Sequence, residues 1–160
     1  MNDLTLEADV RFAVCELVGS GAPDVLRDAG LPVPETEQTA LPCGAGLVAF
    51  TGRNDYLVVT ADPWTPPAAT PPWCLTRSDR VLCLSGGGWA HAMRQLCPHD
   101  LRQLPEGGWL AAAVAGVTAW LYRHPDRPDG ILLGCDPSYG AYLDAMLTAV
   151  VRDHDRLAED

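Results

Sequence analysis

Basic residues are scarce in this 160-residue sequence, which has 11 Lys and Arg residues against 21 Asp and Glu residues. The formal net charge is −10 at pH 7. Such a surplus of negative charge repels phosphate backbones and anionic lipid headgroups, so it argues against nucleic acid or an anionic membrane surface as a partner. The charge is otherwise typical of a protein that stays in solution.

Long apolar runs and targeting signals are also missing. The longest apolar stretch, residues 109–122, is interrupted by Gly116 and is shorter than the roughly 20 residues that a membrane-spanning helix needs. Residues 1–9 carry acidic side chains and no cationic run before an apolar segment, so they do not resemble a secretory signal. The sequence therefore predicts a soluble, cytoplasmic protein.

The six cysteines include no C-x-x-C pair. A disulfide framework is typical of shorter, secreted, loop-rich chains, which this sequence does not resemble. Three of the cysteines lie in strand-like runs, where cysteine usually behaves as a small buried hydrophobe. We expect all six thiols to be reduced.

The hydrophobic content, residue periodicity and turn signals of the sequence indicate an α+β fold. Hydrophobic residues make up 48% of the chain, enough for the core of one domain over residues 1–160. Residue periodicity and turn signals predict strands at 11–18, 46–50, 56–60, 80–84, 109–114, 117–123 and 131–135. They predict helices at 23–30, 89–97 and 137–152, the last with an apolar stripe that includes Tyr139 and Tyr142 and a charged tail that frays.

The order of these elements repeats. A strand, a helix and a hairpin occur in residues 10–61 and again in residues 76–152. This order predicts duplicated units in which antiparallel sheet is covered by helices on one face. A Pro-rich connector, residues 62–73, joins the two halves; its five prolines exclude a regular helix or a central strand.

The five tryptophans are numerous for this length. Trp64 and Trp73 flank the connector. They either fold back onto the domain or anchor a partner protein, and the sequence leaves both interpretations open. The candidate partner-interface residues are Trp64, Trp73, Cys97, His99, Asp100 and Trp109. No catalytic or metal-binding residue is assigned.

Residues 97–100, Cys-Pro-His-Asp, form the most suggestive polar cluster. A cysteine, a histidine and an aspartate can serve as nucleophile, base and orienting acid, but such groups normally come from separate elements. Cys97 and His99 could also begin a zinc site, although the remaining cysteines and histidines lack the paired spacing. The simpler interpretation is that Pro98 ends a helix and that His99 or Asp100 bonds to nearby backbone. The other histidines are expected at the surface: His91, His124 and His154.

Ser85 and three following glycines lie between a predicted strand and a predicted helix. Such a loop can place backbone amides around an anion. The sequence here lacks the Lys-Ser/Thr of a P-loop and the glycine spacing of a dinucleotide fingerprint, so a tight turn is favoured over a nucleotide site.

Several stretches together resemble the gamma subunit family of heterotetrameric sarcosine oxidases, most strongly over residues 76–151 and more loosely at 47–59. The stretches that carry the resemblance are RSDRVLCLSG (77–86), LCPHDL (96–101), LPEGG (104–108), VAGVTAWL (114–121), GILL (130–133), Ser138-Tyr139 and the closing helix.

This resemblance implies a fold related to the folate-binding domain of glycine-cleavage aminomethyltransferases. It also implies assembly with larger alpha and beta flavoprotein subunits and a small delta subunit. The complex would oxidatively demethylate sarcosine or another N-methyl or secondary amine. FAD, FMN, NAD and tetrahydrofolate are then expected in the partner subunits, and none bound by this chain.

Two features depart from the family pattern. The Pro-rich segment 62–73 stands where the family has a helix, and Gly87 replaces the usual proline after Ser85-Gly86. An accessory, non-catalytic subunit is thus the leading hypothesis. The alternative is a stand-alone small enzyme or ligand-binding protein that reuses the folate-binding-type fold, with its pocket near Cys97, His99 and Asp100.

Overall fold

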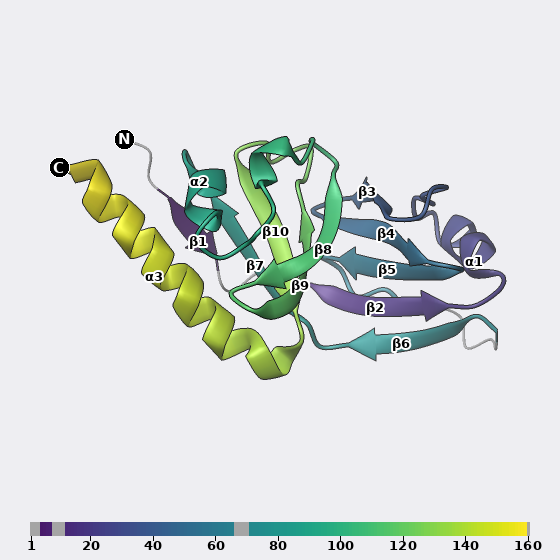
Figure 1. The fold of residues 1–160 in the computed structure, drawn as a ribbon. Helices are drawn as coiled ribbons and strands as arrows, with labels where there is room; N and C mark the ends of the chain where they lie inside the picture. The colour runs from purple at the N-terminus through teal and green to yellow at the C-terminus, as the bar shows by residue number, and fades with distance from the viewer. Residues whose placement is uncertain (1–3, 8–11, 66–70, 160) are drawn as a thin grey trace. The chain divides into compact units, whose positions relative to one another are not determined.

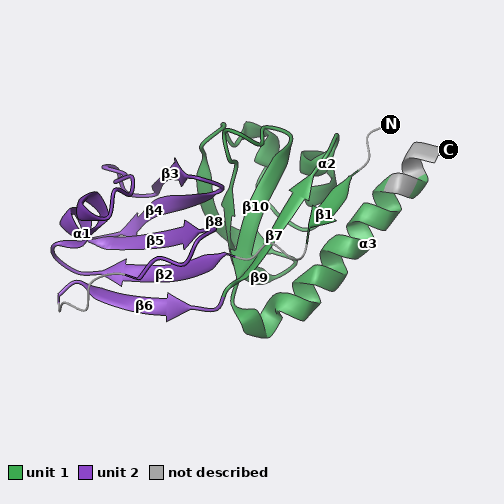
Figure 2. Cartoon of the chain, turned by 180° about the vertical axis from the view of Figure 1, so that it is seen from behind, with its two compact units in different colours: residues 1–10, 79–160 green, residues 11–78 purple. Residues whose placement is uncertain are grey.

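A computed structural model describes residues 4–7, 12–65 and 71–159 of the chain. The chain divides into two compact units, shown in different colours in Figure 2. Unit 1 contains Met1–Val10 and Asp79–Asp160, and unit 2 contains Arg11–Ser78. Each unit has a five-stranded sheet in which the paired strands are antiparallel. The α+β class predicted from the sequence is therefore confirmed, with two sheets.

Unit 2 is a sheet with one short helix. Its elements are β2 (Ala13–Val18), α1 (Ala22–Asp28), β3 (Thr39–Cys43), β4 (Gly46–Gly52), β5 (Asp55–Thr60) and β6 (Trp73–Arg77). The strand order is β3-β4-β5-β2-β6, so β3 and β6 are the two edges of the sheet (Figure 1).

Local sequence explains the centre of this unit. The first turn of α1 contains a proline, whose fixed φ matches that of a helix. Ala22 and Leu26 of this helix are buried in a cluster with Leu17 and Val58 of the sheet. The predicted hairpin is β4–β5.

Asn54 lies in the turn between β4 and β5, and its φ of 60° falls in the left-handed region. Asparagine tolerates this left-handed backbone conformation better than most residues, which suits Asn54 to the turn between β4 and β5.

The two edge strands of unit 2 were not predicted. β3 contains Pro42, which an edge strand tolerates because one side of its backbone needs no sheet partner. β6 begins at Trp73, the last residue of the segment predicted as a connector. Residues 66–70 of that segment, and Arg11 at the predicted start of β2, lie outside the described residues.

Unit 1 combines a second sheet with two helices. Its elements are β1 (Thr5–Glu7), β7 (Arg80–Ser85), α2 (Trp89–Met93), the 3-10 turn η1 (Leu101–Gln103), β8 (Trp109–Val114), β9 (Val117–Tyr122), β10 (Gly130–Cys135), the 3-10 turn η2 (Pro137–Tyr139) and α3 (Gly140–Glu159). The strand order is β1-β7-β10-β9-β8.

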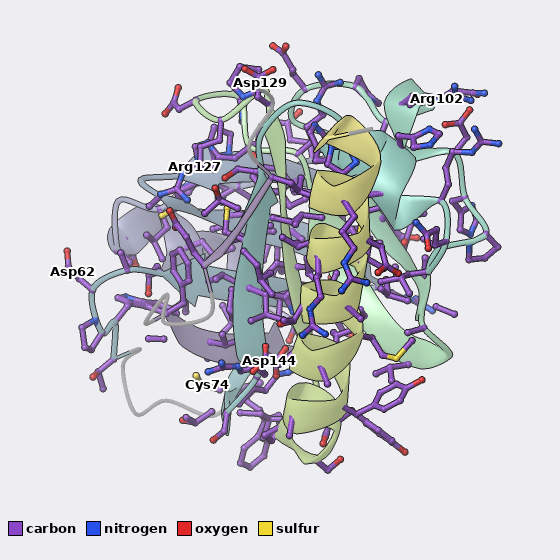
Figure 3. All side chains as sticks on the ribbon, turned by 90° about the vertical axis from the view of Figure 1, so that its left-hand side faces the viewer. Asp62, Cys74, Arg102, Arg127, Asp129 and Asp144 are labelled. Carbon is purple, nitrogen blue, oxygen red and sulfur yellow. The ribbon has the colours of Figure 1, made fainter. Side chains whose placement is uncertain are left out.

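Helices α2 and α3 cover one face of this sheet. Met93 of α2 and Leu143 and Leu147 of α3 are fully buried in the same cluster as Leu82 and Leu133 of the strands. Along a strand, alternate side chains point to the same face, so both helices pack on the face that these leucines present. Arg80 at the start of β7 donates from Nε and Nη2 to Oδ2 of Asp144 on α3, at 3.1 and 2.7 Å. Asp144 is labelled on the helix in Figure 3.

Three predictions for the helices of unit 1 need correction. α2 ends at Met93 instead of residue 97, and the chain continues in turns. α3 runs to Glu159, past the predicted fraying point after Arg152. Tyr139 and Tyr142 were predicted in the buried stripe, but they are 54% and 48% exposed, and the Tyr142 hydroxyl donates to the Ala115 carbonyl at 3.0 Å.

The glycines before α2 form a tight turn. Gly86 and Gly88 have positive φ values of 113° and 89°, which side chains rarely adopt. α2 has only five residues, too few to present a helix terminus that binds an anion. The turn interpretation of this segment therefore agrees with the structure.

The predicted order of strand, helix and hairpin occurs in both units, as β2-α1-β4-β5 and as β7-α2-β8-β9. The sheets nevertheless differ, because β5 pairs directly with β2 whereas β10 lies between β9 and β7. That residues 1–160 act as a single domain stays a prediction.

Candidate functional site

Edge strand β6 presents an exposed apolar pair. Trp73 is 58% exposed and Leu75 is 53% exposed, and their spacing of two residues places them on one face of the strand. Leu75 lies opposite Glu16 of β2, and Arg77 forms an ion pair with Glu16 at 3.5 Å. The apolar pair is therefore bordered by charge on the same strands. Natural sheets usually protect their edges with charged residues or proline, so this exposure needs a reason.

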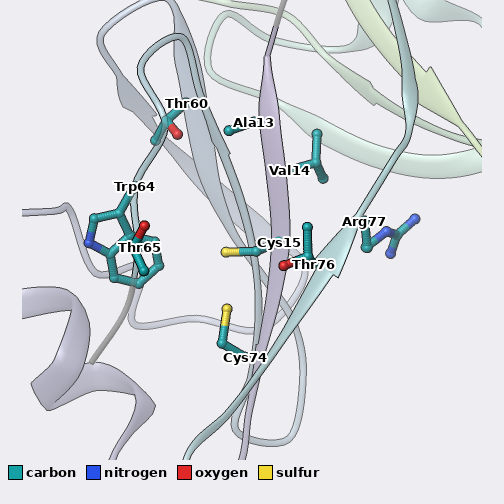
Figure 4. A pocket seen from close by; sticks show the side chains of 9 residues that line it. All are labelled: Ala13, Val14, Cys15, Thr60, Trp64, Thr65, Cys74, Thr76 and Arg77. Carbon is teal, nitrogen blue, oxygen red and sulfur yellow. The ribbon is translucent and has the colours of Figure 1, made fainter. Parts of the chain in front are cut away.

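The opposite face of β6 borders a small pocket within unit 2. Its volume is about 170 Å³. The lining residues are Ala13, Val14, Cys15, Thr60, Trp64, Thr65, Cys74, Thr76 and Arg77 (Figure 4). Pockets that enclose a drug-sized ligand usually measure about 300–1,000 Å³, so this one is suited to a smaller molecule.

Two thiols face each other in this pocket. Cys15 of β2 lies opposite Thr76 of β6, and Leu17 lies opposite Cys74, so the two cysteines are diagonal neighbours on one face of the sheet. Figure 4 shows their sulfur atoms pointing toward one another. Burial, the neighbouring Cys74 and a hydrogen bond with its thiol raise the pKa of Cys15 to about 12. Cys15 is therefore a neutral thiol at physiological pH.

The Cys97–Asp100 segment belongs to unit 1 and is built differently from a catalytic triad. Cys97 is 4% exposed and packs in the core, whereas His99 is exposed. The carboxylate of Asp100 accepts from the backbone amide of Arg102 at 3.2 Å and from its guanidinium at 2.7 Å. Arg102 lies at the surface (Figure 3).

Asp100 is consequently occupied by local contacts. The hydrogen bond with the Arg102 side chain, the largest cause, holds the pKa of Asp100 well below its usual range. A carboxylate of such low basicity is a poor proton acceptor at neutral pH. Asp100 also caps η1 through the Arg102 amide, which agrees with the interpretation that this segment bonds to nearby backbone.

The two remaining candidates occupy different positions. Trp64 is half-buried and lines the pocket of unit 2, so it does not share a face with Trp73. Trp109 lies half-buried on β8 of unit 1, opposite Tyr122. Its indole Nε1 is buried and has no hydrogen-bond partner among the described residues. Of the candidates, Trp73 is therefore the large apolar side chain that is most available to a partner.

Sequence reasoning missed two features of these surfaces. Leu75 was not singled out, although the spacing Trp73-x-Leu75 is the alternation expected of a strand with one exposed face. His124 was expected at the surface but is 3% exposed, and its Nδ1 accepts from the Asp126 amide at 3.1 Å. Its ring lies edge-on to Tyr122, with the ring centroids 5.6 Å apart.

Where the structure describes the chain, no three His, Cys, Asp or Glu side chains come together as a ligand set for a metal ion. Within residues 4–7, 12–65 and 71–159, no helix combines the length and the apolar character needed to cross a lipid bilayer.

The sequence matches no protein-family model and no curated protein. The structure is similar to a chain of the heterotetrameric sarcosine oxidase from Corynebacterium sp. U-96, solved in complex with pyrrole 2-carboxylate. The TM-score is 0.78 at 18% sequence identity, and the match covers 94% of this chain and 84% of that chain. The protein thus shares its fold with a chain of a heterotetrameric sarcosine oxidase.

Proposed function

We propose that this chain is an accessory, non-catalytic subunit, of the gamma type, in a cytoplasmic flavoenzyme complex that resembles sarcosine oxidase. The fold shared with a chain of heterotetrameric sarcosine oxidase over 94% of the sequence carries the proposal. The partners are larger alpha and beta flavoprotein subunits, with a small delta subunit. The complex oxidatively demethylates N-methyl or secondary amines, and its FAD, FMN, NAD and tetrahydrofolate are held by the partner subunits.

The surface of β6 supports a role in assembly. Trp73 and Leu75 leave more than half of their area exposed on an edge strand, beside the Glu16–Arg77 pair. Interfaces typically have an aromatic or aliphatic centre and a polar rim, and tryptophan is enriched among the residues that contribute most to binding. An aminomethyltransferase-type, folate-binding fold is part of the same proposal.

Co-expression tests the assembly directly. The tagged chain is produced together with the proteins encoded by the reading frames beside its own gene and is purified at low and high salt. We expect a complex that elutes as one species and carries flavin absorbance. A monodisperse monomer without flavoprotein at both salt concentrations would contradict the proposed function.

Substitution of the exposed pair tests its part in the interface. The double variant Trp73→Ser with Leu75→Ser is expected to bind the flavoprotein subunits at least about 30-fold more weakly, since residues that dominate an interface contribute about 2 kcal/mol or more. Isothermal titration with the purified partner measures the change.

The matched control is Leu41→Ser on β3, the opposite edge of the same sheet. Leu41 is 41% exposed and should be replaceable without loss of affinity. Equal affinities for the Trp73/Leu75 variant and the wild type would exclude β6 from the interface.

A further inference from the structure

We propose that Cys15 and Cys74 form an oxidisable dithiol that a small peroxide converts to a disulfide between β2 and β6. The observation behind it is the meeting of two thiols on neighbouring strands inside a pocket of unit 2. This inference is independent of the proposed function, because it concerns only the chemistry of unit 2.

The geometry favours this pair. A disulfide requires Cα atoms about 4.4–6.8 Å apart and side chains that point toward each other. Diagonal neighbours across an antiparallel pair are typically about 7–8 Å apart, just beyond that range, so closing the bond requires a backbone movement. The thiols already share a hydrogen bond. β6 is an edge strand paired with β2, so a small shift of this strand can close the remaining gap.

The pocket provides access for a small oxidant. Its volume of about 170 Å³ exceeds the roughly 30 Å³ that one water molecule occupies in the liquid, so hydrogen peroxide fits. The lining of the pocket also includes three threonines and an arginine: Thr60, Thr65, Thr76 and Arg77.

The two sulfurs have different roles. Cys15 is 8% exposed, and burial and the adjacent Cys74 keep its pKa high, so it remains a thiol. Cys74 is more exposed, and it is the sulfur that meets the oxidant first. Because Cys15 is already beside Cys74, its attack on the oxidised sulfur needs no encounter with a thiol from solution.

The reaction balances as two substitutions. The Cys74 thiolate attacks one oxygen of hydrogen peroxide, the O–O bond breaks, and the departing hydroxide takes a proton to become water, leaving a sulfenic acid on Cys74. The Cys15 sulfur then attacks the Cys74 sulfur, the S–O bond breaks, and the Cys15 proton leaves with the hydroxide as a second water. Two thiols are oxidised by two electrons in total, and the peroxide is reduced.

Peptide mapping of the full-length protein tests this proposal. The reduced protein is treated with hydrogen peroxide, alkylated after unfolding, and digested without reductant. We expect a cross-linked peptide pair that contains Cys15 and Cys74, and a fall from six free thiols to four. Oxidation of Cys74 without this cross-link, or cross-links distributed over other cysteine pairs, would overturn the proposal.

Serine variants of the two cysteines test which sulfur acts in each step of the oxidation. With Cys15→Ser, the sulfenic acid on Cys74 should persist and be trapped by dimedone, whereas Cys74→Ser should abolish the cross-link. The matched control is Cys43→Ser, which removes a half-buried cysteine of the same unit and should leave the Cys15–Cys74 disulfide intact. If a serine variant fails to fold, the mapping of the wild-type protein still decides the outcome.

Discussion

Oxidation of the Cys15–Cys74 pair is expected to raise the free energy of unfolding by up to about 4 kcal/mol. The disulfide would close a loop of about 60 residues, which removes many conformations from the unfolded chain. Strain subtracts from this gain, because the diagonal pair has to draw β6 toward β2.

Urea unfolding of the oxidised and reduced protein measures the effect. With a slope of about 2 kcal/mol per molar urea, a gain of this size moves the midpoint by roughly 2 M. The Cys74→Ser variant, treated with the same oxidant, should show no shift. A lower midpoint after oxidation of the wild type would show that strain exceeds the effect of closing the loop, contrary to this prediction.

Alanine at position 46 is expected to destabilise unit 2 by more than about 3 kcal/mol. A Cβ atom on Gly46 would lie 1.9 Å from the carbonyl oxygen of Val59 and 2.8 Å from its carbonyl carbon. Val59 belongs to β5, which pairs with β4 on one side and β2 on the other, so its backbone cannot move away without breaking sheet pairing. The clash must therefore distort the sheet itself.

The control for this substitution lies in the same strand. Gly52 ends β4, and a Cβ atom there would meet only the Asp55 carboxylate at 3.9 Å, an ordinary contact. Gly52→Ala should change the free energy of unfolding by no more than about 1 kcal/mol. Urea unfolding curves of the two variants compare the sites, and equal midpoints would contradict the importance of the close approach at Gly46.

The proposed interface and the proposed disulfide both involve strand β6. Cys74 lies between Trp73 and Leu75 in sequence but on the opposite face of the strand. A disulfide at Cys74 would thus act on the strand that carries the exposed apolar pair. Measuring partner affinity before and after oxidation would show whether the thiol chemistry influences assembly, and the Cys15→Ser variant separates an effect of the disulfide from an effect of the oxidant.

Local sequence determined the central elements of both sheets. The hairpins β4–β5 and β8–β9 were predicted because each has two strand-forming runs joined by a short turn. α1 was predicted from its proline at the start and Gly30 after its end. These signals act over a few neighbouring residues, so they need no knowledge of the rest of the chain.

Tertiary structure decided the edges and the candidate sites. β1 and β6 are strands because partners distant in sequence, β7 and β2, align with them, and nothing within their few residues specifies that pairing. His124 is buried for a similar reason, since the ring of Tyr122 lies against it. The sequence alone indicated an α+β chain with aromatic candidates for partner binding. The meeting of Cys15 with Cys74 depends on strand register, which is set by packing over the whole sheet and not by the residues beside either cysteine.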